Sequence, residues 1–249
     1  EVVNVLAIGV LNSGGVLDIW FQLGFDGLRL DVADELDNST LNRIFESSKR
    51  NCDKIIIIGE VWDNASNKCN YGHRMEYFLG NELTSVMNYP VKDAILAYVR
   101  YGDLWSSNLW RTLISVYIED YPHEIAYSLM NLLSTHDSVR MITKLAGKEV
   151  DDHDKNWQFE NDTLSPQEYR LGRARAMISY LILYFLPGVP SIFYGDEIGL
   201  SGQKDPFCRK CFPWNRIDKK FLHFFKNLGK LRSSFADFLS IANFNIVKI

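Results

Sequence analysis

The stretch GFDGLRLDVADEL, residues 24–36, decides the fold class, because it reads as a short strand that ends on an acidic residue. Gly24 ends a preceding helical pattern, and the alternating run at residues 27–32 is typical of a strand. A second run, KIIIIGEV at residues 54–61, also ends near an acid. Its uninterrupted isoleucines suit a strand that is covered on both faces, as in parallel sheets. The two runs therefore indicate a parallel α/β sheet.

Further strands and helices follow from the hydrophobic periodicity. Ser165, Pro166 and Glu168 form a capping box that begins a long helix, which Pro187 ends after Leu186. The polar residues 148–165 are expected to form a loop. Other strands are expected at residues 83–88, 125–133 and 189–194, and helices at residues 16–23, around 41–45, and at 91–101, 104–117 and 221–231.

The alternation of strands and helices predicts either a doubly wound sheet or a closed (β/α)8 barrel. A barrel needs eight strands and typically about 250 residues. Only five strands are expected in these 249 residues, and residues 237–249 look like the start of another module. We therefore expect part of a barrel.

Composition and charge argue against several classes of function. The chain carries 27 basic and 31 acidic side chains, a formal net charge of −4, so it lacks the surplus of positive charge that nucleic-acid binding requires. The longest apolar stretch, residues 177–194, is interrupted by Pro187, Gly188 and Pro190, which predicts a buried helix and a strand instead of a membrane span. Residues 1–11 lack the basic region of a secretory signal.

The four cysteines do not form a disulfide or zinc pattern. Cys208 and Cys211 make a C-x-x-C pair, but Cys52 and Cys69 stand alone, so no second pair completes a zinc site. The pattern favours reduced thiols in a cytosolic protein, although the compartment stays open. We expect neither a metal nor a cofactor in this chain.

Three acids, Asp31, Glu60 and Asp137, come at or just past the ends of expected strands. Because the carboxyl ends of parallel strands face one side of a sheet, the three can converge on one cleft. Each acid taken singly could equally be a helix cap or a loop charge. Arg29 precedes Asp31 by two residues, so both side chains should point to the same face, where the guanidinium would keep Asp31 ionised.

The surroundings of these acids suggest sugar chemistry. Glu60 follows an apolar run, where partial burial would favour its protonated form and suit it to donate a proton. His136, beside Asp137, offers a hydrogen bond to a polar ligand, although a lone histidine is more often structural. Two carboxyl groups on either side of a glycosidic bond are the machinery of a retaining glycosidase. Nearby aromatic residues could stack on sugar rings or simply pack: Trp62, Tyr71, Tyr89 and Tyr194.

Four segments resemble the α-amylase family, and they occur in the family's order. Residues 24–36, IGEVW at 58–62 and LLSTHDSVR at 132–140 resemble three of its ordered sequence regions, and VPSIFYGDEIG at 189–199 resembles its eighth-strand segment. The resemblance covers the chain roughly from Gly14 to the last expected helix. Any one of these matches alone would be moderate support for the resemblance. Four matches in the family's order are strong support.

The resemblance implies a role for each residue of the expected cleft. Asp31 would be the nucleophile, Glu60 the general acid/base, and Asp137 the third acid, which holds sugar hydroxyls and stabilises the transition state. Arg29 would orient Asp31, and His136 would donate a hydrogen bond to the sugar at the cleaved bond.

The resemblance also indicates a branch of the family. VADEL at residues 32–36 resembles the neopullulanase, cyclomaltodextrinase and maltogenic-amylase group, which implies that Glu35 lies near the acceptor sugars. The segment 204–214 resembles the one that lines the donor-side subsites, which implies substrate contacts for Asp205 and Arg209, and Trp62 is expected to contact substrate as well. The implied partner is an α-glucan with α-1,4 and also α-1,6 bonds, such as a maltooligosaccharide, a cyclodextrin or pullulan.

The chain departs from the family pattern at its third-strand region, an Asp followed by Asn-His, which we do not find. By this resemblance, residues 1–236 are the carboxyl-terminal portion of the barrel, about strands four to eight, and residues 237–249 begin a C-terminal β-domain. We expect this polypeptide alone to be inactive or nearly so, with open edges that favour aggregation or pairing. Calcium binding and a homodimer are options for the full-length protein.

Three other functions stay open. A glucan transferase would share every acid but exclude water from the acceptor side. A non-catalytic sugar-binding or partner-binding relative is disfavoured by the presence of all three acids. An unrelated phosphate-binding barrel finds no support, since the sequence has no glycine-rich phosphate loop.

Overall fold

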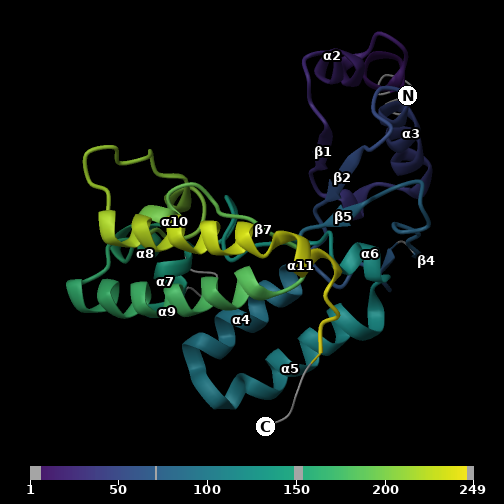
Figure 1. The fold of residues 1–249 in the computed structure, drawn as a ribbon. Coiled ribbons are helices and arrows are strands. Elements are labelled where there is room, and N and C mark those ends of the chain that lie inside the picture. The colour runs from purple at the N-terminus through teal and green to yellow at the C-terminus, as the bar shows by residue number, and fades with distance from the viewer. Residues whose placement is uncertain (1–6, 71, 149–153, 246–249) are drawn as a thin grey trace.

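The protein is described by a computed structural model that covers residues 7–70, 72–148 and 154–245 (Figure 1). Its five parallel strands are short: β1 (Gly27–Leu30), β2 (Ile56–Gly59), β5 (Ser85–Val86), β6 (Met130–Asn131) and β7 (Val189–Pro190). Strands β1, β2 and β5 form one sheet in this order, and β6 pairs with β7. A parallel bridge between Met87 and Met130 joins β5 to β6, so the five strands follow one another in chain order.

The register brings the carboxyl ends of β1 and β2 together, with Leu30 beside Gly59. Gly59 has no room for a side chain, because an added Cβ would lie 2.6 Å from a methyl carbon of Leu83 and 3.2 Å from the Cβ of Ala33. The chain is therefore tightly packed at the end of β2.

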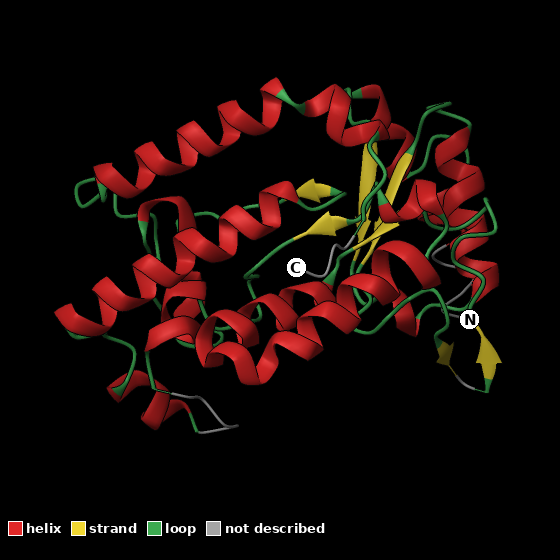
Figure 2. Cartoon of the chain, turned by 60° about the horizontal axis from the view of Figure 1, so that its bottom comes forward, coloured by secondary structure: helices red, strands yellow, loops and turns green. Residues whose placement is uncertain are grey.

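Helices lie on several sides of the strands (Figure 2), and α9 (Pro166–Phe185) is the longest of those described. Helices α4 (Tyr89–Tyr101), α7 (Met141–Ala146) and α10 (Lys219–Ser234) pack against it. The other helices are α2 (Val16–Gln22), α3 (Asn38–Lys49), α5 (Ser106–Ile114), α6 (His123–Ala126), α8 (Lys155–Glu160) and α11 (Ala236–Ile241). Short helical turns are η1 (Ala7–Leu11), η2 (Ala33–Glu35), η3 (Gly102–Trp105), η4 (Ser115–Asp120), η5 (Asp196–Ile198) and η6 (Phe207–Arg209), and β3 (Cys69–Asn70) pairs with β4 (His73–Arg74) in antiparallel orientation.

Most of the predicted elements are present. A strand lies within each of the five predicted runs, although most are shorter than predicted, and helices α2, α3, α4 and α10 match their predicted positions. The capping box of α9 is confirmed: the Ser165 hydroxyl accepts from the Glu168 N–H, and the Glu168 carboxylate accepts from the Ser165 N–H at 2.8 Å. The helix ends at Phe185, just before Pro187.

Three predictions about single elements are wrong. Residues 125–133 are not one strand, because Pro122 begins the helical turn α6 and only Met130–Asn131 pair with a neighbour. Residues 104–117 are not one α-helix but η3, α5 and the wider helical turn η4, whose last residue, Asp120, accepts a hydrogen bond from Asn64 at 2.6 Å. The predicted loop at 148–165 contains α8, which Asp154 caps by accepting from the Trp157 N–H, while residues 149–153 lie outside the described ones.

Most buried apolar residues form one large cluster, a second small cluster contains Met87, Tyr89 and Leu132, and β2 is covered on one face more than on the other. Ile55 and Ile57 are buried, whereas Ile56 is 52% exposed, so the prediction that this strand is covered on both faces is wrong for Ile56. In the predicted β-domain segment, Ala236–Ile241 is helical and residues 246–249 lie outside the described ones, so the β-domain stays a prediction. Among the described residues, no helix is long and apolar enough to span a lipid bilayer.

Glu82, just before β5, is a buried acid with an unsatisfied oxygen. Its side chain belongs to a residue only 3% exposed, and within the described chain its Oε2 atom has no hydrogen-bond partner. Burial, together with the negative charges of Glu76 and Asp37, raises the pKa of Glu82 from 4.5 to about 7. The folded state thus holds this proton more tightly than the unfolded state, and folding is favoured where Glu82 is protonated.

We expect Glu82→Gln to stabilise the fold at pH 8 by on the order of 2 kcal/mol and to change little at pH 4.5. The reason is that the stability contributed by protonated Glu82 is fully present below pH 4.5 and is lost as the pH rises through about 7. Urea unfolding at both pH values measures the difference. The exposed Glu46→Gln serves as control, and an equal effect of Glu82→Gln at both pH values would contradict the assignment.

Candidate active site

Asp31 and Glu60 follow the last residues of β1 and β2, which the parallel register places side by side. The hydrogen-bonding ladder continues past the strands: the Glu60 N–H donates to the Leu30 carbonyl and the Ala33 N–H donates to the Glu60 carbonyl, both at 3.0 Å. The sheet itself therefore sets the spacing of the two acids.

One guanidinium contacts both carboxyl groups. Arg29 Nη1 pairs with an oxygen of Asp31, and Nη2 lies 3.0 Å from Glu60 Oε2. The prediction that Arg29 and Asp31 share a face is confirmed. A hydrogen bond from Arg29 holds the pKa of Asp31 below its ordinary value; the positive charge of Arg29, a hydrogen bond with Glu60 and His136 act in the same direction, while desolvation acts against them.

Glu60 is buried and both of its oxygens accept hydrogen bonds. Oε2 accepts from the Val32 N–H at 3.0 Å as well as facing Arg29, and Oε1 accepts from Trp62 Nε1 at 3.2 Å and from the Tyr89 hydroxyl at 3.3 Å. Burial and the adjacent Glu60 carboxylate raise the pKa of Tyr89, so this phenol keeps its proton and acts as a donor.

The backbone directly after Asp31 is strained. Val32 has φ of 44°, in the left-handed region that β-branched residues avoid. This conformation turns the Val32 N–H toward Glu60 and starts η2. Strain of this kind persists only where the surroundings enforce it, and it is concentrated at functional sites.

The third acid is held between a histidine and an arginine. Asp137 Oδ2 lies 2.9 Å from His136 Nε2, and its Oδ1 lies 2.9 Å from Arg209 Nη2. Arg209 also pairs with Asp205 at 2.7 Å and donates to the His136 carbonyl at 3.0 Å. Four residues predicted from the sequence to contact substrate or transition state thus form one connected cluster.

A cavity of about 170 Å³ joins the two groups of residues. Arg29 lines it from β1, and Thr135 and His136 line it from the loop after β6. Asp31 and Glu60 are bonded to Arg29, and Asp137 is bonded to His136. None of the three acids lines the cavity itself, but each forms an ion pair with a residue that does, either Arg29 or His136.

The remaining predicted residues lie at the margin of this site. Glu35 is exposed in η2, four residues after Asp31. Trp62 is half exposed and stacks on Tyr89 with ring centroids 4.6 Å apart. Tyr194 donates to the Lys210 carbonyl at 2.8 Å, and Tyr71 lies outside the described residues.

Sequence reasoning gave no role to a buried ion pair beneath the third acid. Arg140 and Asp196 are almost inaccessible and lie 3.0 Å apart, and Asp196 also accepts from Ser134 and from Tyr180. Arg140 further donates to the Cys208 carbonyl at 2.8 Å. The sequence signal for this ion pair is that both residues lie in mostly apolar motifs. A charged residue buried in such a motif is rarely left without a partner of opposite charge.

The cysteines are free, and Cys208 is buried with its thiol donating to the His136 carbonyl at 3.0 Å. Cys211 is exposed. No group of three or more His, Cys, Asp or Glu side chains in the described parts of the chain could hold a metal ion.

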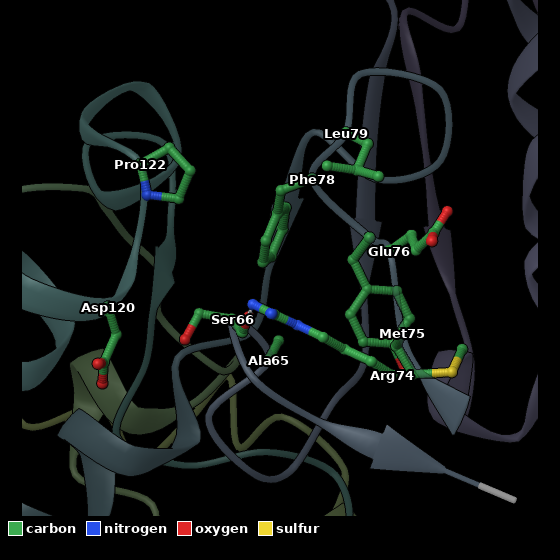
Figure 3. Close-up of a pocket in the computed structure, with 10 residues that line it drawn as sticks. Ala65, Ser66, Arg74, Met75, Glu76, Phe78, Leu79, Asp120 and Pro122 are labelled. Atoms are coloured by element: carbon green, nitrogen blue, oxygen red, sulfur yellow. Dashed lines mark hydrogen bonds between the residues drawn. The ribbon is translucent and has the colours of Figure 1, made fainter. Parts of the chain in front are cut away.

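A separate cavity of about 350 Å³, shown in Figure 3, lies between β4 and η4. Arg74 extends across it beside Phe78, and Asp120 lies on the opposite wall. Neither the three acids nor their partners Arg29 and His136 line this cavity, so we do not assign the chemistry to it.

Two carboxyl groups share one guanidinium, and a third acid pairs with a histidine that lines the same cavity as this guanidinium, an arrangement that fits glycoside hydrolysis. The family model for the alpha amylase catalytic domain matches residues 10–235, and the chain therefore belongs to the α-amylase family. The resemblance noted from the sequence is confirmed.

Similar proteins include a cyclomaltodextrinase and a neopullulanase, two names of the predicted branch, and also an amylopullulanase. The chain is 32% identical to an amylopullulanase of Thermoanaerobacter thermohydrosulfuricus, across 85% of this chain and 14% of that protein. It is 29% identical to a cyclomaltodextrinase of Geobacillus thermopakistaniensis (86% and 31%) and 28% identical to neopullulanase 2 of Thermoactinomyces vulgaris (89% and 32%). The chain thus spans about a third or less of the length of these relatives.

The fold agrees with this family. The type III pullulan hydrolase from Thermococcus kodakarensis superposes with a TM-score of 0.73 and 27% identity, over 92% of this chain and 37% of that one. Structural neighbours of this kind are α-amylase-family barrel enzymes, so the chain resembles glycosidases in both sequence and fold.

We expect Arg140→Leu to lower the free energy of unfolding by about 3–5 kcal/mol, because it leaves the buried Asp196 carboxylate without its cation. Urea denaturation measures the loss. Arg209→Leu is the matched control, since its ion pair with Asp137 is partly exposed and should contribute no more than about 1 kcal/mol. Equal losses for the two variants would show that burial does not set the strength of the Arg140 pair.

Proposed function

We propose that this chain carries the catalytic residues of a retaining α-glucan hydrolase, with Asp31 as nucleophile, Glu60 as general acid/base and Asp137 as the third acid. The observation that carries the proposal is the shared contact of Arg29 with Asp31 and Glu60. One guanidinium can contact both groups only if they are close, as they are in retaining enzymes.

In the first step, Asp31 attacks the anomeric carbon while Glu60 protonates the leaving oxygen. The lowered pKa of Asp31 keeps it ionised for the attack. In the second step, Glu60 accepts a proton from water, which then cleaves the sugar from Asp31. Arg29 and the Val32 N–H both contact Glu60 Oε2, so they hold the carboxyl group in one orientation for both steps.

Asp137 and His136 act on the sugar held at the cleaved bond. Their mutual contact and the link to Arg209 fix the direction in which each can accept or donate. Asp205 and Arg209 would contact the donor-side sugars, and Glu35 and Trp62 the acceptor-side sugars. The substrates would be maltooligosaccharides, cyclodextrins or pullulan, with α-1,4 bonds and additionally α-1,6 bonds.

The five strands would be the fourth to eighth strands of the (β/α)8 barrel. In the described residues β1 pairs on one side only, and the Asp31 side chain is 72% exposed. A site this open cannot exclude water or enclose a sugar ring, so the 249-residue polypeptide alone would have little turnover. Calcium binding and a homodimer remain predictions for a longer protein.

The residue roles can be tested in a chimera that joins this chain to the preceding barrel strands of a cyclomaltodextrinase. Glu60→Gln should lower kcat/KM for maltotriose about 10²–10⁴-fold but affect α-maltosyl fluoride much less, because fluoride leaves without a proton. Asp31→Asn should abolish the cleavage of both substrates, and the exposed Glu46→Gln should change neither. Equal losses with both substrates for Glu60→Gln would refute its role as the acid.

The polypeptide of residues 1–249, assayed with maltooligosaccharides and cyclodextrins, should show less than about 1% of the rate of the chimera, because the open site forgoes positioning and water exclusion. Size-exclusion chromatography in the same buffer establishes its oligomeric state. Robust turnover by a monomer would overturn this prediction while leaving the residue roles intact.

A further inference from the structure

Helix α9 carries apolar side chains on the side that faces solvent as well as on the side that faces the core. Ala176, Tyr180 and Leu183 are buried, and the helix packs against α7, α4 and α10. Figure 1 shows α9 lying beside α10. A helix at the surface of a globular protein ordinarily exposes polar residues on its outer side. The outer side of α9 departs from this pattern, which indicates a contact surface.

The exposed residues of α9 form one continuous apolar stripe. Between positions 171 and 185, all of which the structure describes, the exposed residues follow one another at intervals of three, four, three and four: Leu171, Ala174, Ile178, Leu181 and Phe185. The four large ones among them are 42% to 50% exposed. This alternation of three and four is the spacing of the contact seam in a coiled coil. We call these five residues the α9 stripe.

The size of the α9 stripe fits one helix of similar length. Its ends, Leu171 and Phe185, lie about 21 Å apart along the helix axis, because an α-helix rises about 1.5 Å per residue. A contact between two helices of this length buries less than the roughly 800 Å² per partner of a standard interface. The stripe therefore suits a small and reversible interface between two helices.

The α9 stripe is complementary to an antiparallel copy of itself. The small Ala174 lies in its amino-terminal half and the bulky Phe185 at its carboxyl end, so reversing one copy sets the narrow part of each stripe against the wide part of the other. Arg170 is exposed just before the stripe. Two parallel copies would bring their Arg170 side chains together, whereas antiparallel copies keep these like charges at opposite ends. The stripe itself carries no charge that would select a charged partner.

We propose that the α9 stripe is a dimer interface, in which α9 of two copies of this chain pack antiparallel about a two-fold axis near Ile178. Both copies would contribute the same surface, as in most dimers of identical chains. The interface differs from the open edge of β1, where a strand of another chain could pair. No residue of the stripe lines the cavity at the candidate active site, so the dimer does not depend on the proposed function.

The test is sedimentation velocity of residues 1–249, which should show a monomer–dimer equilibrium with a dissociation constant on the order of 10 µM. Ile178→Glu and Ile178→Lys should each weaken the dimer at least about tenfold, because two like charges would meet near the axis. An equimolar mixture of the two variants should dimerise again, because opposite charges then meet. Ile118→Lys is the matched control, since Ile118 is 52% exposed in η4, outside the stripe.

A second pair of variants tests the antiparallel orientation. Leu171→Lys and Phe185→Glu should each weaken the dimer, but their mixture should restore it. In an antiparallel pair, the new lysine of one copy meets the new glutamate of the other, and the remaining Leu171 meets the remaining Phe185. In a parallel pair, each introduced charge would instead face an apolar residue, and mixing would restore nothing.

The outcomes decide the proposal. It is overturned if the parent chain stays monomeric, because something other than a second copy then covers the stripe. It is also overturned if both Ile178 variants dimerise like the parent, since pairing then occurs elsewhere, for example at the edge of β1. Dimerisation of the Ile178 mixture without that of the Leu171 and Phe185 mixture would overturn the antiparallel orientation. Circular dichroism checks that each variant folds.

Discussion

The whole site depends on the guanidinium of Arg29, which lies between two carboxyl groups that the sheet forces together. Because Leu30 lies beside Gly59, the residues that follow them cannot separate without breaking the pairing of β1 and β2. Two carboxylates at such proximity repel each other, and one would be driven to take up a proton. A single cation in contact with both offsets this repulsion and fixes the direction of each group.

The half of the site that carries Asp137 is attached to this sheet by buried polar contacts more than by strand pairing. Only an isolated bridge joins β5 to β6. Beside it, the Asn131 carbonyl oxygen Oδ1 accepts from Asn88 at 2.8 Å and from Tyr117 at 3.1 Å, and Asn131 Nδ2 donates to the Pro187 carbonyl at 2.6 Å. Satisfied networks of this kind are directional and rigid, so they can hold two sheets in a fixed relation where few backbone bonds do.

The sequence could predict features that depend on neighbouring residues, such as where a strand ends. It could not predict features that depend on contacts between residues far apart in the chain. The ends of β1 and β2, and hence the positions of Asp31 and Glu60, follow from short apolar runs and their flanking residues. The burial of Glu60 by Tyr89 depends on two segments 29 residues apart. Likewise, the left-handed conformation of Val32 is enforced by Glu60 and not by any preference of valine.

The pairing of Arg140 with Asp196, 56 residues later, shows the same limit. Both residues lie in motifs that the sequence singled out, yet nothing local says that they are buried against each other. The prediction of one strand at residues 125–133 failed for a different reason. This apolar run has a strand-like composition, but it contributes first to the helical turn α6 and then to the strand β6. Its division depends on which residues can reach β7, and that is a property of the assembled fold.

In the proposed reaction, one cation would serve both steps, because the two carboxyl groups that it contacts would change charge in turn. The Asp31 side chain is 72% exposed and that of Glu60 is 3% exposed. When Asp31 bonds to the sugar, it loses the charge that attracts Arg29, and the guanidinium is left to Glu60. Glu60 has just given up its proton at that moment, and its ionised form is the one that activates water. The charge state of one carboxyl group is thus coupled to that of the other through Arg29, without any further group having to move.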